Sequence, residues 1–278
     1  MDFFFRFPGG RDRALTFSYD DGVEQDARII ALLQNHGMKG TFNISGDMFW
    51  PENTPYPEGK ISRRIPESRL REIYLNETSE IAIHGFRHMR MACFPKGAAA
   101  YEIVEDRKKL EHLTGTLITG GAYAHGSYNE EAIRALDACG VEYCRTIKNT
   151  HNFLLPENWL AWHPTCHHND PQLMALAEDF LTRAVKVTPQ VFYLWGHGYE
   201  FDKDNNWEVL ERFVHRMAGH SNVWYATNGE ICRYVKAWNS LRASADGSML
   251  HNPTAISVWL FCGGKNAEIR PGETVRLW

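Results

Sequence analysis

Two adjacent acidic residues, Asp20 and Asp21, end an apolar run near the start of the chain, in the stretch Thr16–Gly22. Neighbouring carboxylates repel each other, so such a pair needs a nearby cation or a chemical role. A helix N-cap at this turn would explain one acid but not both. We therefore expect the pair to bind a cation or to take part in catalysis.

Two histidines, His84 and His88, are four residues apart and follow the buried-strand pattern Glu80–Ile83. This spacing puts both imidazoles on one face of a helical turn, as in many metal sites, although surface or core pairs share it. Together with one carboxylate of Asp20–Asp21 they would bind a divalent ion and leave a position for water. The other carboxylate would then be free to act as a general base.

A third histidine, His197, lies between Gly196 and Gly198 at the end of another strand-like run. Histidine titrates near neutral pH and is a common proton donor to a leaving amine or alcohol. The alternative is a hydrogen bond to a neighbouring loop.

The elements that must position these side chains alternate along the chain. We predict strands at Ala14–Tyr19, Gly40–Ile44, Ser79–Ile83, Thr116–Ala122, Val141–Ile147, Gln190–Trp195 and Asn222–Ala226. We predict helices at Val23–Asn35, Glu67–Tyr74, Ala98–Leu113, Asn129–Ala138, Pro171–Ala184, Trp207–Met217 and Gly229–Leu241. Seven such units predict an α/β fold with a parallel sheet and favour a barrel over an open doubly wound sheet.

The polar clusters fall where a barrel would place an active site, at the carboxyl ends of the strands. Asp20 and Asp21 follow the first strand, and His84 and His88 follow the third. The segment 123–129 follows the fourth, and His197 follows the sixth. Their separation along the chain is therefore compatible with one site.

Two segments depart from this alternation. Trp50–Pro66 contains four prolines and is predicted to be a loop over one rim. We expect residues 1–243 to form the barrel and residues 244–278 to form a short β-strand appendage packed on it. Its predicted antiparallel strands are Ala255–Cys262, Ala267–Ile269 and Thr274–Leu277.

Composition limits the class of protein. The chain has 278 residues, of which 44% are hydrophobic, and a formal net charge of −4. There is no block of like charge, so we expect neither a nucleic-acid nor a membrane partner. No signal-peptide or membrane-spanning pattern is seen, which favours a cytoplasmic protein. The six cysteines contain no CxxC and are expected to be reduced core thiols. The sequence leaves the oligomeric state open.

These motifs resemble the polysaccharide deacetylases, metal-dependent carbohydrate esterases of the nodulation-deacetylase homology type with a distorted (β/α)7 barrel. The family motif TFDDG is similar to residues 16–22, with two residues interposed, and its H(S/T)xxH motif is similar to residues 84–88. The resemblance implies that Asp20 is the catalytic base and that Asp21, His84 and His88 bind the metal. It also implies that His197 is the general acid.

The third family motif, RxPYGxxN, is similar to residues 122–129 but has lost its arginine and its proline. Gly126 and Asn129 are kept. By position, the backbone N–H of His125 would hold the oxyanion, and Tyr123 belongs to the same predicted substrate-binding segment. Ala122 replaces the arginine that orients the base, and no acid near Trp162 matches that arginine's partner.

We predict that Arg145, at the end of the neighbouring fifth strand, stands in for this arginine. The alternative is that it pairs with another acid such as Glu142 or covers the rim. Five aromatic residues are also expected near the rims, where they would stack on sugars if they are not core residues: Phe49, Trp50, Tyr123, Trp162 and Tyr199.

The resemblance implies a hydrolase that removes an N- or O-linked acetyl group from a carbohydrate. We expect the metal to be Zn²⁺, with Co²⁺, Mn²⁺ or Ni²⁺ as alternatives. Some relatives hydrolyse linear or cyclic amides, so an allantoinase-like activity is an alternative. A non-catalytic carbohydrate-binding barrel and an Fe(II) oxygenase, which also uses two histidines and a carboxylate, are alternatives of other classes.

Overall fold

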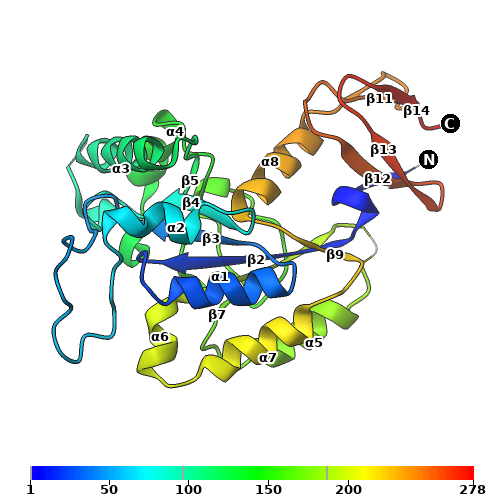
Figure 1. Cartoon of the computed structure of the whole chain (residues 1–278). Helices are drawn as coiled ribbons and strands as arrows, with labels where there is room; N and C mark the ends of the chain where they lie inside the picture. The colour runs from blue at the N-terminus through cyan, green and yellow to red at the C-terminus, as the bar shows by residue number, and fades with distance from the viewer. Residues whose placement is uncertain (1, 96, 186) are drawn as a thin grey trace.

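The computed structural model describes residues 2–95, 97–185 and 187–278. At its centre is a curled parallel sheet with strand order β6-β5-β4-β3-β2-β8-β7, and β9 also pairs with β2 (Figure 1). The strands are β2 (Arg13–Asp20), β3 (Gly40–Ile44), β4 (Ser79–Ile83), β5 (Gly120–Ala122), β6 (Tyr143–Arg145), β7 (Cys166–His167), β8 (Gln190–His197) and β9 (Val223–Tyr225). The predicted α/β class and distorted barrel are confirmed.

Each predicted strand overlaps an observed one, but the path around the sheet differs in one respect. β7 was missed, because it has two residues and runs into the polar stretch 167–170, where no alternation is visible. β9 pairs with the first residues of β2, whereas β3 pairs with the last ones. Beyond β6, a single bridge between Arg145 and Trp162 continues the sheet.

Helices surround the curled sheet (Figure 1). They are α1 (Asp26–Asn35), α2 (Leu70–Tyr74), α3 (Ala98–Thr114), α4 (Glu130–Ala138), α5 (Leu173–Thr182), α6 (Gly198–Lys203), α7 (Trp207–Met217) and α8 (Asn228–Asn239). Helix α7 shows why they form: Leu210, Phe213, Val214 and Met217 recur at helical spacing and are all buried. The short helix α6, directly after His197, was not predicted.

Strand β2 fixes the position of the site. All eight of its residues are buried, because it has hydrogen-bonded neighbours on both sides. In the register of the sheet its last residue, Asp20, lies level with Asn43 of β3 and His197 of β8. The carboxyl ends of three strands therefore place these side chains next to one another.

The appendage consists of two antiparallel sheets, next to α8 in Figure 1. One contains β12 (Val258–Cys262), β13 (Lys265–Ile269) and β1 (Phe3–Arg6), and the other contains β10 (Arg242–Ala243), β11 (Met249–His251) and β14 (Thr274–Arg276). The participation of the N-terminal strand was not predicted. The division of the chain at residue 243 stays a prediction.

The cysteines and the helices were also expected to be those of a protein with reduced thiols and no membrane span. None of the six cysteines forms a disulfide; four are buried and Cys139 is half-buried, but Cys93 is exposed, so the expectation of a core thiol is wrong for Cys93. Within the described part of the chain, no helix has the length and apolarity needed to cross a membrane.

Candidate active site

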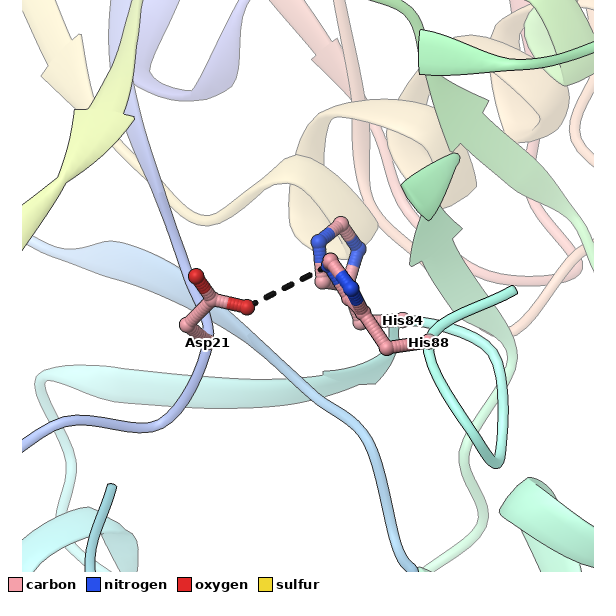
Figure 2. Close-up of side chains that lie close together, drawn as sticks. All are labelled: Asp21, His84 and His88. Atoms are coloured by element: carbon pink, nitrogen blue, oxygen red, sulfur yellow. Dashed lines mark ion pairs between the residues drawn. The ribbon is translucent and has the colours of Figure 1, made fainter. Parts of the chain in front are cut away.

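A cluster of two histidines and one carboxylate lies at the carboxyl ends of β2 and β4 (Figure 2). One potential ligand atom from each of Asp21, His84 and His88 lies within 4.8 Å of the other two. Nε2 of His88 is 3.3 Å from Oδ1 of Asp21. Two imidazole nitrogens and a carboxylate oxygen form a donor set that suits Zn²⁺ and similar divalent ions.

The hydrogen bonds of His84 leave the right atom available for a metal. Its Nδ1 donates to the carbonyl oxygen of Ala122 at 2.9 Å, so Nε2 carries the lone pair. The backbone N–H of His84 donates to the buried Asp106 of α3, which also accepts from Gly46. Burial lowers the pKa of His84, and burial with the neighbouring His84 lowers the pKa of His88 to about 4. Both rings are therefore neutral at neutral pH, which is the form that binds metals.

Asp21 has a partner that the sequence did not indicate. Arg64, from the loop between β3 and α2, donates to Oδ1 of Asp21 at 2.6 Å. Asp21 itself has a left-handed backbone, with φ of 81°, just before Gly22. Its carboxylate is thus turned toward His88 and Arg64.

Asp20 is buried and lies between two histidines. Asn43 donates to its Oδ1 at 2.8 Å, and Nη2 of Arg145 donates to Oδ1 at 2.6 Å and also to Oδ2. Its Oδ2 is 3.7 Å from Nε2 of His84 and 3.9 Å from Nε2 of His197. Burial would raise the pKa of Asp20, but Arg145 and the two histidines outweigh it and lower the pKa. The carboxylate is therefore ionised and able to accept a proton.

Arg145 is fully buried and makes these bonds from β6, one strand beyond β5. Its guanidinium carbon lies 4.5 Å from the centre of the Trp195 ring. The alternative pairing with Glu142 is wrong, since Glu142 lies 3.4 Å from Lys236 instead. The contact with Asp20 is the one that the missing arginine of the third motif would make.

His197 is part of a second cluster, centred on Glu200 of α6. Oε2 of Glu200 is 3.3 Å from Nδ1 of His197, 3.0 Å from Nε2 of His167 and 3.3 Å from Nε2 of His168. It also accepts the backbone N–H of His197 at 3.1 Å. Burial would lower the pKa of His197, but the carboxylates of Glu200 and Asp20 outweigh it and raise the pKa. His197 is thus biased toward its protonated form.

In the segment after β5, His125 lies near the site, whereas Asn129 caps a helix. The ring of His125 lies 4.5 Å from that of His88, and His125 has a left-handed backbone with φ of 57°. Gly126 also has a positive φ. Asn129 is the N-cap of α4, since its side chain accepts the N–H of Ala132 at 2.9 Å.

Two of the five aromatic predictions are wrong. Tyr123 and Trp162 are each 1% exposed, and the Tyr123 hydroxyl donates to the carbonyl of Leu160, so both are core residues. The other three, Phe49, Trp50 and Tyr199, are half-exposed. The side chain of Tyr123 is therefore unable to contact substrate.

Four residues near the site were missed in the sequence, and for two of them a local sequence feature could have indicated a role. Asn43 is a polar residue near the end of a buried strand, and Glu200 is three residues after His197, the spacing of a capping box. Arg64 and His167 lie in segments without periodicity, so nothing in the sequence pointed to them.

The family model for polysaccharide deacetylases matches residues 8–144. This match covers the strands that carry Asp20, Asp21, His84 and His88. The chain belongs to the polysaccharide deacetylase family. No curated protein matches the sequence.

Solved structures agree on the fold. A candidate polysaccharide deacetylase from Mycobacterium smegmatis has a TM-score of 0.58 at 16% identity, covering 85% of this chain and 94% of its own. A family 4 carbohydrate esterase from Streptomyces lividans, in complex with acetate, has a TM-score of 0.51 at 14% identity, covering 78% and 92%. A mutant of a family pseudoenzyme from Bacillus anthracis, with restored enzymatic activity, has a TM-score of 0.52 at 14% identity, covering 82% and 70%.

Proposed function

We propose that this protein is a metal-dependent hydrolase that removes an acetyl group from a carbohydrate. The observation that carries the proposal is the position of Asp20, whose Oδ2 faces His84 of the first cluster and His197 of the second. A base placed between a metal site and a proton donor is the arrangement that hydrolysis of an amide or ester needs.

The residues of the first cluster would hold the ion. Asp21, His84 and His88 provide one oxygen and two nitrogens, and we expect Zn²⁺, with Co²⁺, Mn²⁺ or Ni²⁺ as alternatives. When bound, such an ion polarises the acetyl carbonyl and makes water more acidic.

The protein's own groups would move the protons. Asp20 takes a proton from the attacking water, and Arg145 and Asn43 hold its carboxylate ionised and oriented. His197 gives its Nε2 proton to the departing nitrogen or oxygen, while Glu200 keeps the other proton on Nδ1. By position, the backbone N–H of His125 would bind the oxygen that becomes negative.

The test is acetate release by the zinc-loaded protein from N-acetylated and O-acetylated oligosaccharides. Asp20→Asn should lower the rate by about 10²–10⁴-fold, because an amide accepts no proton from water. The exposed Asp137→Asn is the matched control and should keep the rate.

The metal content of each variant is measured in the same samples. An Asp20→Asn protein that keeps both its metal and its rate would place the base elsewhere. Turnover of allantoin, with no acetate released from any sugar, would favour the amidohydrolase alternative. Sugar binding without turnover by the metal-loaded wild type would favour a non-catalytic barrel.

A further inference from the structure

The loop between β3 and α2 is fixed beside the site. At its start, the N–H of Trp50 donates to Ile65 at 2.9 Å. At its end, Arg64 forms a bridge with Val23, and Ile65 donates to Gly22 at 3.0 Å. In Figure 1 it projects beyond the carboxyl end of β2. Both ends of the loop are thus tied to each other and to the turn that follows Asp21.

Packing within the loop also holds it in shape. The rings of Trp50 and Tyr56 are 5.0 Å apart, and the Tyr56 hydroxyl donates to the carbonyl of Arg64 at 2.7 Å. The indole N–H of Trp50 donates to Thr54 at 2.8 Å. These contacts give the loop a defined conformation.

A pocket of about 310 Å³ lies within this loop, between its first and its last part. Its lining residues are Asp47, Met48, Phe49, Trp50, Pro51, Lys60, Ser62 and Arg64. Arg64 both lines this pocket and donates to Asp21. The pocket therefore lies next to the cluster of Asp21, His84 and His88. Its volume is that of a small-ligand site.

The charges in this loop pocket are unequal. Lys60 and Arg64 are cationic, and Asp47 is the one acid of the lining. Nζ of Lys60 lies 5.3 Å from the centre of the Trp50 ring, and within the described ranges it forms no ion pair. Arg64 has five N–H donors, of which the bond to Asp21 uses one. An aromatic ring with two adjacent cations suits a sugar that carries a carboxylate.

We propose that the loop pocket is a subsite for an acidic sugar next to the acetylated one. The sugar would pack on Trp50, and its carboxylate would be bound by Lys60 and Arg64. This inference rests on the proposed deacetylase function and adds the class of the neighbouring sugar.

The test uses an oligosaccharide in which N-acetylglucosamine alternates with glucuronate, and the same compound with its carboxylates methyl-esterified. The wild type should show a kcat/KM about fivefold higher for the free acid, the size expected for a partly exposed charge pair. This preference should shrink as salt is added. Lys60→Gln should remove the preference, Lys60→Arg should keep it, and Lys265→Gln on the appendage is the matched control.

Equal kcat/KM for the acid and its ester in the wild type, or a preference that survives Lys60→Gln, overturns the subsite. Binding of both compounds to Asp20→Asn, measured by calorimetry, separates this result from failure of the proposed function. Absence of acetate release from every substrate, with tighter binding of the acid that needs Lys60, would refute the deacetylase and leave the subsite standing.

Discussion

Two clusters of histidines and carboxylates lie on either side of Asp20, and they resemble each other in composition. Asp21, His84 and His88 form the first, and His167, His197 and Glu200 form the second. In each, three potential ligand atoms lie within 4.8 Å of one another.

The hydrogen bonds behind the rings distinguish the two. In the first cluster, Nδ1 of His84 donates to a carbonyl, so its Nε2 offers a lone pair. In the second, Nδ1 of His167 accepts the N–H of Asn169 at 3.1 Å, so its Nε2 carries the hydrogen and donates to Glu200. We infer that the first cluster suits a metal and that the second holds protons. The hydrogen-bond partner of Nδ1 sets which ring nitrogen carries the proton, and therefore whether Nε2 can bind a metal or donate a proton.

The largest expected effect concerns metal binding. His84→Ala and Asp21→Ala should each lose the bound ion and nearly all hydrolysis, because two ligands hold zinc far more weakly than three. His167→Ala, the matched change in the second cluster, should keep one ion per chain. Metal analysis after dialysis measures this. Two ions in the wild type, or loss of the ion in His167→Ala, would contradict the distinction between the clusters.

The next effect concerns the residue that holds Asp20 between the clusters. Arg145→Met should lower the free energy of unfolding by about 3–5 kcal/mol, since it leaves a buried carboxylate without its partner. Denaturant unfolding of the apo protein measures it. The exposed Arg134→Met on α4 is the control and should change stability by less than about 1 kcal/mol. An Arg145→Met protein with the unfolding free energy of the wild type would mean that Asn43 alone is enough to stabilise the buried carboxylate of Asp20.

The smallest effect concerns the second cluster. Glu200→Gln should lower kcat about tenfold and move the alkaline limb of the pH profile to lower pH. Glu200 raises the pKa of His197, so the acid stays protonated until the pH rises through that value. Without the carboxylate, the pKa falls and activity is lost sooner as pH rises. An unshifted limb, or a limb at higher pH, would remove Glu200 from this role.

Much of the fold was readable because strand and helix patterns are local. The buried run of β2 and the apolar face of α7 lie within single stretches, and the family motifs indicated Asp20, Asp21, His84, His88 and His197. The register of the sheet then brings those strand ends together, as expected for parallel strands. The role of Arg145 could be predicted because neighbouring strands are about 4.8 Å apart, so a long side chain can reach the site from the next strand.

The rest depends on contacts between distant segments. Arg64 reaches Asp21 because the loop's backbone pairs with residues 22–24, and no local pattern encodes such a pairing. Tyr123 belonged to a functional motif, yet its side chain turns into the core to reach Leu160. A motif fixes where the backbone lies at such a position, and packing decides which way the side chain points.

The pairing of β1 with β12 has a consequence for how the chain folds during translation. Phe4 pairs with Phe261, so about 250 residues must be made after the first strand before its partner exists. At ~5–20 residues per second, the aromatic segment Phe3–Phe7 waits for roughly tens of seconds. During that interval it is an unpaired apolar strand, the kind of segment that chaperones bind and that aggregates when they are scarce.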